Sequence, residues 1–271
     1  MSRTIGPSID GGGEGAKEAS IQAALECTRS EEEAVKDVLG TLDSFERLVE
    51  DIEPHMPQGT RVNQPRILAD SSHGSGAEAV LDAFHETFGD AGANESTNYS
   101  DCLRRVAHEF SQGLAGHLKR AYEQGAFPPA MKNRLLAEIR QTRRRHRSAL
   151  DSLEAEVNSL ETLQRELDQI YSRLEELEPG VGDEIEFSTL INRYHETDDH
   201  LTSLDELVEE RQFLINSGTG DHGYTIDHRR LTTVIYAEFS CNHPGLKAVA
   251  NCAEACTETR RNLLIDLGLA D

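Results

Sequence analysis

The stretch from residue 129 to residue 178 constrains the fold more than any other part of this 271-residue chain. Core-facing candidates recur there at alternating steps of three and four residues, with two polar interruptions, and such spacing places side chains on one face of an α-helix. They are Leu136, Ile139, His146, Leu150, Leu153, Val157, Leu160, Leu167, Tyr171 and Leu174, with a second stripe at Leu163, Ile170 and Leu177. We therefore predict one continuous helix, on the order of 70 Å long at about 1.5 Å per residue.

A second long helix is predicted to return alongside the first. The segment "EPGVGDE" turns the chain, and residues 184–216 resume the amphipathic spacing with Phe187, Ile191, Tyr194, Leu201, Leu204, Val208 and Ile215. An apolar stripe wider than two positions per heptad is typical of a bundle or an antiparallel hairpin. The sequence therefore predicts an all-α protein: a long antiparallel helical hairpin, coiled-coil-like, with arms 129–178 and 184–216, packed with shorter helices.

The N-terminal quarter of the chain is predicted to form one helix between two irregular segments. Residues 1–17 are rich in glycine and are expected to be a disordered tail. Residues 18–53 carry apolar side chains at helical spacing and form an acidic amphipathic helix, which Pro54 and Pro57 end. Residues 54–76 are expected to be a linker.

Residues 77–271 are predicted to form a helical domain that contains the hairpin. A short helix is expected around 77–88, another from about 99 to 124, and a C-terminal helix pair over 226–267. Pro129 in "GAFPPAMK" suits the first turn of the long helix. No convincing strand and no internal repeat is visible in the sequence.

The charge balance narrows the classes of function. The formal net charge is −22, and only five of the 27 basic residues are lysines. Such an acidic, lysine-poor surface is tolerated in a salt-rich cytoplasm, where salt screens self-repulsion, so we interpret the composition as halophilic. Nonspecific attraction to nucleic acid or anionic membrane is disfavoured. No apolar run is long enough to span a membrane, and no secretory signal opens the chain, so we expect a cytoplasmic protein.

Positive charge is nevertheless concentrated in "RQTRRRHRSAL", residues 140–150. On a helix, Arg140, Arg143, Arg144 and Arg147 lie within an arc of about 100° beside the apolar stripe. Residues 132–147 have a net charge of +6, whereas residues 148–178 have −7 and residues 18–53 have −8. The arginines can therefore pair with the acidic N-terminal helix of the same chain, which is the interpretation we favour, since guanidinium groups suit carboxylates. A protein partner and nucleic acid are the alternatives.

The cysteine and histidine residues near the C-terminus offer a candidate metal site. Cys241, His243, Cys252 and Cys256 are four residues of the types that bind zinc tetrahedrally. Their spacing lacks the C-x-x-C pair of common structural zinc sites, and buried reduced thiols are the simpler interpretation. Five cysteines, an odd number, likewise favour reduced thiols over disulfides.

No motif of catalysis is complete. In "YHETDDH" the two histidines are five residues apart, one more than a zincin helix requires, and "GGGEG" lacks the lysine and hydroxyl residue of a P-loop. The Glu-x-x-His pairs of a di-iron bundle are absent from the sequence. We therefore expect no enzymatic activity and no cofactor.

From residue 98 onward the chain resembles a known family. The segments "YSDCLRRVAHEFSQGLAGHLKRAYEQGAFPPAMKNRLLAEI", "EERQFLI" and "YAEFSCNHPGLKAVANCAEACTETRRNLL" are similar to an uncharacterised family of haloarchaeal proteins, a domain of unknown function. Its most specific pieces here are "GAFPPAMK" and "EERQ", and "NHPGL" departs from the aromatic and proline pair that members tend to carry. The resemblance implies an all-helical, cytoplasmic protein of a halophile, and it implies no catalytic residues.

Two functions from different classes remain. The favoured one is a non-enzymatic helical scaffold or adaptor that contacts a protein partner or a second copy of itself. The other is a DNA-associated regulator that uses the basic helix start together with the C-terminal helix pair, including Arg229 and Arg230. That pair is joined by "CNHPG", but its second helix is small and apolar over most of its length, which suits packing better than base recognition.

Overall fold

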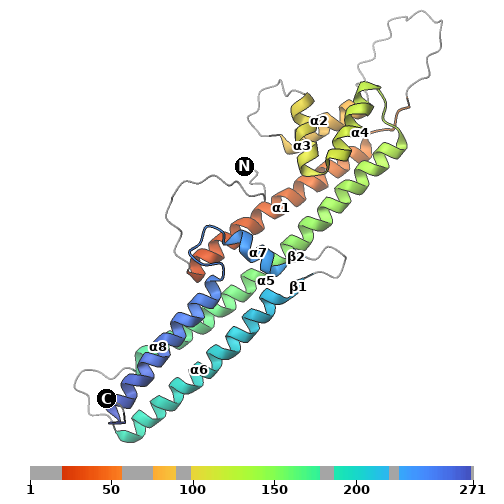
Figure 1. The fold of residues 1–271 in the computed structure, drawn as a ribbon. Coiled ribbons are helices and arrows are strands. Elements are labelled where there is room, and N and C mark those ends of the chain that lie inside the picture. Colours follow the sequence, from red (N-terminus) through yellow and green to blue (C-terminus); the bar gives the residue numbers. More distant parts are fainter. Residues whose placement is uncertain (1–19, 57–75, 90–98, 178–185, 220–225, 270–271) are drawn as a thin grey trace, which may run out of the picture. The chain divides into compact units, whose positions relative to one another are not determined.

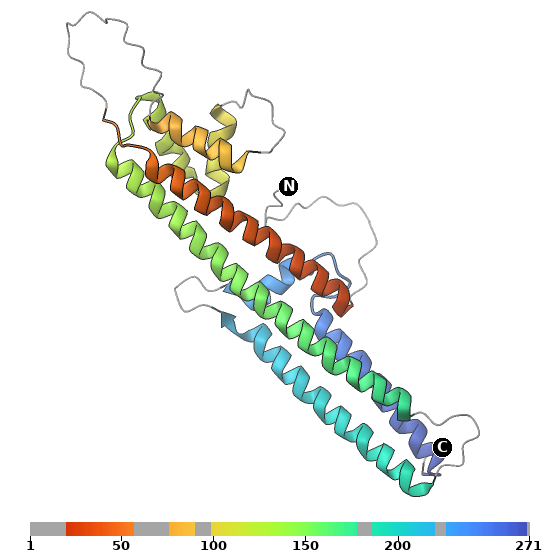
Figure 2. The same ribbon diagram turned by 180° about the vertical axis from the view of Figure 1, so that it is seen from behind.

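The protein is all-α, as predicted, in a computed structural model that describes residues 20–56, 76–89, 99–177, 186–219 and 226–269. The predicted tail, 1–17, and most of the predicted linker, 54–76, lie outside these residues. The described part of the chain contains eight helices, coloured along the sequence in Figures 1 and 2. None of these helices combines the length and the apolar character that a bilayer crossing requires.

The described residues form two compact units. Unit 1 comprises residues 34–147, and unit 2 comprises residues 20–33 and 148–269. The division falls within the two longest helices, α1 (Ile21–Asp51) and α5 (Pro129–Leu177), which pack antiparallel. It differs from the expected single helical domain over 77–271, because the N-terminal helix supplies part of the core of each unit.

Unit 1 gathers three short helices around one end of α1, as Figure 1 shows. They are α2 (Gly76–Phe88), α3 (Tyr99–Glu109) and α4 (Gln112–Glu123). Four phenylalanine rings from α1, α2 and the end of α3 meet in the core at centroid distances of 4.6–6.3 Å: Phe45, Phe84, Phe88 and Phe110. Offset and edge-on aromatic pairs of this kind stabilise a core beyond the area they bury.

The single helix expected from about 99 to 124 is two helices in the structure. Ser111 has an extended backbone, and its side-chain oxygen accepts a hydrogen bond from the backbone N–H of Leu114 at 3.2 Å. A serine in this position satisfies one of the free N–H groups at a helix start, and α4 therefore begins anew after it.

Unit 2 is built on the second half of α5, flanked by α6 (Phe187–Asn216) and α8 (Pro244–Asp266), which lie along it in both views (Figures 1 and 2). Between α6 and α8 come α7 (His228–Ile235) and a short antiparallel ribbon of β1 (Gly218–Thr219) and β2 (Ile226–Asp227). Each strand has only two residues, which is too short for an alternating pattern, so this ribbon was not predicted from the sequence. The predicted hairpin arms correspond to α5 and α6.

A row of buried positions on α5 alternates in steps of three and four residues through unit 2, with Ala149, Ser152 and Val157 buried beside it. The row consists of Leu153, Glu156, Leu160, Leu163, Leu167, Ile170, Leu174 and Leu177. The facing helix α6 buries Leu190, Thr197, Leu204 and Arg211, each seven residues after the last. This is the spacing of a coiled-coil seam. Two of its positions, at the same level, are occupied by charged residues of opposite sign.

Candidate functional site

The predicted arginine cluster, which consists of Arg140, Arg143, Arg144 and Arg147, contains two arginines that pair with α1 and two that do not. Arg140 Nε donates to Glu46 Oε1 at 2.6 Å, and its Nη2 donates to Glu50 Oε1 at 3.1 Å. Arg143 Nη1 donates to Asp43 Oδ1 at 2.9 Å and also to Glu46 Oε2. Two of the four arginines thus make the ion pairs with the N-terminal helix that the charge pattern predicted, all within unit 1.

Glu46 is the centre of this arrangement, which we call the Glu46 cluster: Glu46 with Arg140 and Arg143. The Glu46 side chain is 9% exposed, whereas those of Arg140 and Arg143 are 48% and 36% exposed. Its hydrogen bond and its charge raise the pKa of Arg140 above the ordinary value. The arginines therefore cover a nearly buried carboxylate and keep their own charges in contact with water, which screens them.

The other two arginines of the cluster point elsewhere. Arg144 and Arg147 are exposed and make no ion pair or hydrogen bond with any residue that the structure describes. They are three residues apart on α5, so their side chains leave the same side of the helix. We call these two residues the arginine face; their charge is available for an external carboxylate.

Unit 2 contains a buried charged network that sequence reasoning did not find. Glu156 on α5 is fully buried, and both of its oxygens are shared by partners from three other elements. Oε1 accepts hydrogen bonds from Arg211 Nη2 and from the Tyr236 hydroxyl, each at 2.6 Å. Oε2 accepts from Arg211 Nη1 and from His228 Nε2, each at 2.8 Å. We call these four residues the Glu156 network.

The burial of this network is nearly complete. The side chains of Glu156 and His228 are 0% exposed and that of Arg211 is 1% exposed. Thr28 of α1 extends the network, because its hydroxyl lies 3.0 Å from that of Tyr236. Each carboxylate oxygen has two donors, which is the condition under which a buried carboxylate can remain charged.

The pKa values in the network follow from this geometry. Burial raises the pKa of Glu156, but the hydrogen bonds from His228, Arg211 and Tyr236 and the charge of Arg211 outweigh it, and the pKa falls to about 2. Burial and the neighbouring carboxylate raise the pKa of the Tyr236 phenol. At neutral pH the site therefore contains a carboxylate–guanidinium pair held by a neutral phenol.

The start of α8 fits closely against the guanidinium group of Arg211. A Cβ atom on Gly245 would lie 3.3 Å from Arg211 Nε and 3.0 Å from Leu163 Cδ1. Arg211 Nε and His228 Nδ1 are buried and have no hydrogen-bond partner among the described residues. Glycine at this position therefore allows the helix start to approach the ion pair, and the cost is an unsatisfied guanidinium nitrogen.

The four residues of the predicted metal site are not gathered into one group. Cys252 and Cys256 are buried on α8, Cys241 is half-buried before it, and His243 lies at its N-terminal cap. Cys252 is nine positions after His243, a rise of about 13 Å along the helix, which is too far for one ion. The described residues contain no group of three or more His, Cys, Asp and Glu side chains that could hold a metal.

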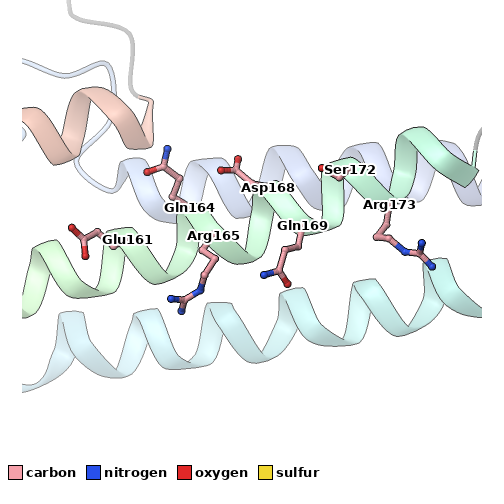
Figure 3. Close-up of a pocket in the computed structure, with 7 residues that line it drawn as sticks. All are labelled: Glu161, Gln164, Arg165, Asp168, Gln169, Ser172 and Arg173. Carbon is pink, nitrogen blue, oxygen red and sulfur yellow. The ribbon is translucent and has the colours of Figure 1, made fainter.

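A shallow polar groove of about 700 Å³ follows the outer face of α5 in unit 2. Figure 3 shows its lining, which comes from α5 alone: Glu161, Gln164, Arg165, Asp168, Gln169, Ser172 and Arg173. Two of its charges are already paired with neighbouring helices, Glu161 with Arg29 at 2.5 Å and Arg173 with Glu196 at 2.6 Å. We interpret the groove as a solvated helix face, because its lining is exposed and polar and two of its four charged groups are already paired within the chain.

Comparison with known proteins identifies the chain at the level of its family. Residues 19–260 match the family described as "Domain of unknown function (DUF7260)". This chain belongs to that family. The match covers the Glu46 cluster, the arginine face, the Glu156 network and both α8 cysteines. No curated protein and no solved structure matches the chain.

Three of the segments that carry the family resemblance contain residues of the Glu156 network or of its surroundings. "EERQ" ends in the residues around Arg211, "YAEFS" contains Tyr236, and "NHPGL" contains Gly245. Arg211 and Tyr236 bind the Glu156 carboxylate, and Gly245 packs against Arg211. One of the two most specific segments of the resemblance, "EERQ", thus contains the arginine of the buried ion pair, and this was a signal from which the pair could have been found.

Proposed function

We propose that this DUF7260 protein is a non-enzymatic, cytoplasmic helical scaffold or adaptor that binds an acidic segment of a protein partner. The observation that carries the proposal is the arginine face: Arg144 and Arg147 are exposed and unpaired among the described residues, although the chain has a formal net charge of −22. Fork-shaped guanidinium groups bind carboxylates in two-point contacts, which a partner's aspartate or glutamate side chains can supply.

The different contacts of the four arginines support this assignment. Arg140 and Arg143 hold their helix to α1 through Glu46, so the neighbouring arginine face is presented from a fixed surface. A preorganised surface binds with less loss of conformational entropy than a flexible one. In unit 2 the Glu156 network fixes how its helices pair, which is the behaviour expected of a rigid scaffold.

The test is recovery of partners from a high-salt lysate, with and without nuclease, by three forms of the full chain. The first is the wild type, the second carries Arg144→Glu and Arg147→Glu, and the third carries Arg229→Glu and Arg230→Glu. Both double variants change the formal net charge from −22 to −26, so they control for the general charge effect. Circular dichroism confirms that each form is helical.

We expect a protein partner that survives nuclease, is lost with the Arg144/Arg147 variant and is retained by the Arg229/Arg230 variant. A second copy of the chain counts as such a partner if the same variant abolishes self-association in sedimentation analysis. Partners that vanish on nuclease treatment and with the Arg229/Arg230 variant would overturn the proposal in favour of a DNA-associated regulator. Retention of all partners by the Arg144/Arg147 variant would also overturn it.

We further propose a haloarchaeal, salt-rich setting for this function. The supporting observations are the surplus of 49 acidic over 27 basic residues and the preference for arginine over lysine. At about 1 M salt the Debye length is about 3 Å, so only short, direct ion pairs keep their strength. Recognition by contacting guanidinium groups suits such a medium better than long-range attraction does.

A further inference from the structure

The outer face of α6 combines exposed carboxylates with an exposed aromatic ring. Phe213 is 78% exposed, more than any other large hydrophobic side chain in the described part of the chain. Glu206 and Glu209 precede it on the same helix, and at 100° per residue the three side chains lie within an arc of about 60°. The buried seam residues Leu204 and Arg211 are on the opposite side of α6. We call Glu206, Glu209 and Phe213 the acidic–aromatic face.

The two carboxylates of this face have no partner within the described chain. Glu206 and Glu209 are exposed, and neither makes an ion pair or a hydrogen bond with any residue that the structure describes. Other acidic residues of α6 are paired: Glu196 with Arg173 on α5 and Asp198 with Arg260 on α8. The acidic–aromatic face therefore offers two negative charges to a partner outside the chain.

We propose that the acidic–aromatic face of one copy of this chain binds the arginine face of a second copy. The inference rests on the proposed function, because it names the partner of the same two arginines. Both charge pairs consist of residues three positions apart on a long helix, Arg144 with Arg147 and Glu206 with Glu209. The two guanidinium groups and the two carboxylates thus have the same separation of about 4.5 Å along their helix axes, and they can pair in register.

Phe213 adds a contact that a purely acidic surface does not offer. It follows Glu209 by about one turn, so a guanidinium group that pairs with Glu209 can also lie against the ring. Guanidinium planes stack on aromatic faces. Covering the ring also removes apolar surface from water, and salt does not screen this contribution. The α6 face thus matches an arginine pair in charge, in spacing and in the chemistry of its aromatic ring.

The contact joins two different surfaces, so each copy carries both halves of it. Such a heterologous contact either closes into a ring or reciprocal pair, or continues from copy to copy. The experiment measures self-association of the full chain by analytical ultracentrifugation in molar KCl. Salt at this concentration screens the long-range repulsion between two chains of net charge −22. We expect the average mass of wild type to rise with protein concentration.

Charge exchange tests which surfaces meet. Glu206→Arg with Glu209→Arg places like charges opposite the arginine face, so we expect association to weaken about tenfold or more. Adding Arg144→Glu and Arg147→Glu to the same chain exchanges the charges of both faces and should restore association. This recovery also shows that the loss does not come from misfolding, which circular dichroism checks independently.

The matched control for charge is Glu254→Arg with Glu258→Arg. Both of these residues are exposed on α8, and this variant changes the formal net charge from −22 to −18, as Glu206→Arg with Glu209→Arg does. It should associate like wild type. Phe213→Ala should weaken association severalfold, whereas Phe187→Ala should not, because Phe187 is 62% exposed on the same helix but lies outside the acidic–aromatic face.

Three results would overturn this inference: wild type that stays monomeric, unchanged association of the Glu206/Glu209 variant, or no recovery in the chain with exchanged charges. The proposed function is tested separately, by recovery of foreign proteins. If the Arg144/Arg147 variant loses a foreign protein while wild type is monomeric, the proposed function stands and its partner is not a second copy. If neither self-association nor any foreign protein depends on Arg144 and Arg147, both proposals are wrong.

Discussion

The Glu46 cluster and the Glu156 network both pair a glutamate of a long helix with arginine, but they differ in how far water reaches them. In the Glu46 cluster the guanidinium groups are one third to one half exposed, whereas in the Glu156 network Arg211 is 1% exposed. Water and salt screen the first set of pairs and are excluded from the second. The same chemistry therefore gives a weak, adjustable contact in unit 1 and a strong, costly one in unit 2.

The difference also concerns what each arrangement can specify. Removing a charge from water costs several kcal/mol, which direct contacts repay only when every partner is in place. The Glu156 network has one partner from each of α6, α7 and the segment following α7. A shift of α6 would leave a buried charge without its counter-charge, and a shift of either other element would remove a hydrogen-bond donor from the buried carboxylate. The Glu156 network is therefore satisfied in only one arrangement of its helices. The Glu46 cluster tolerates small shifts, because its long, exposed side chains can adjust.

Glu156→Gln should produce the largest effect. It leaves the Arg211 guanidinium buried without a counter-charge, and we expect a loss of about 3–5 kcal/mol in the free energy of unfolding. Thermal or urea unfolding in molar KCl measures it. Glu161→Gln on the same helix is the control, because Glu161 is 47% exposed and should change stability little. Equal effects of the two substitutions would show that the buried Glu156 network contributes no more to stability than an exposed ion pair does.

A double-mutant cycle separates attraction within the pair from the cost of an unpaired charge. Glu156→Leu and Arg211→Leu should each be strongly destabilising, whereas the double variant should be less destabilised than their sum by about 1–3 kcal/mol. The reason is that the double variant leaves neither charge buried alone. Additive losses in urea unfolding would mean that Glu156 and Arg211 do not depend on each other.

Acid should remove the contribution of Glu156 over a defined range of pH. Its pKa in the folded protein is about 2, below the ordinary value of 4.5, so the folded state binds fewer protons than the unfolded state between these values. The resulting stabilisation is complete above about pH 5 and disappears as the pH falls through 2. The difference in melting temperature between wild type and Glu156→Gln should therefore shrink over this range. A constant difference down to pH 2 would argue against a charged Glu156.

The sequence predicted the helices well because their signals are local. Apolar spacing over 129–178 and 184–216 predicts α5 and α6, and the chain has Pro129 at the first position of α5. The pairing of Arg140 and Arg143 with α1 was also predictable, because opposite charges in blocks of +6 and −8 are visible without coordinates. In both cases the signal lies within one stretch of the chain, the spacing of apolar residues or the net charge of a block, although the paired residues themselves are 90 to 100 positions apart.

The Glu156 network escaped prediction because its members are single residues on different elements, and no block of charge or apolar stripe marks them in the sequence. A glutamate is expected on the surface unless its partners are known, so the core position was assigned to Val157 alone. Tyr171 was likewise counted as a core residue, yet it is 39% exposed. Periodicity gives the angle of a residue around its helix but not the identity of the groups that it meets.

Glu46→Gln, the same substitution in the Glu46 cluster, should have a small effect. It keeps one oxygen as an acceptor for the guanidinium groups and leaves them hydrated, so we expect the melting temperature to fall by no more than about 3 °C. This loss should decrease further between about 0.1 and 2 M KCl, because salt screens exposed pairs. The loss caused by Glu156→Gln should not decrease in the same series. A Glu46→Gln effect as large and as salt-independent as that of Glu156→Gln would erase the distinction between the two regions.

The smallest expected change is in the wild type itself. Its melting temperature should rise gradually as KCl is added. In unit 2 the second half of α5 and α6 carry net charges of −7 and −8 over residues 148–178 and 183–216, and they lie side by side. At about 0.1 M salt the Debye length is about 10 Å, comparable to the distance between packed helices, so the two helices repel each other. At about 1 M it is about 3 Å, and this repulsion largely disappears.

Salt also screens the attractive ion pairs of the Glu46 cluster, which lowers stability. These pairs are few compared with the like charges on the two helices, and burial shields the Glu156 network from salt. A melting temperature that stays flat or falls from about 0.1 to 2 M KCl would show that the exposed pairs outweigh the repulsion, and it would remove the physical basis for the halophilic interpretation.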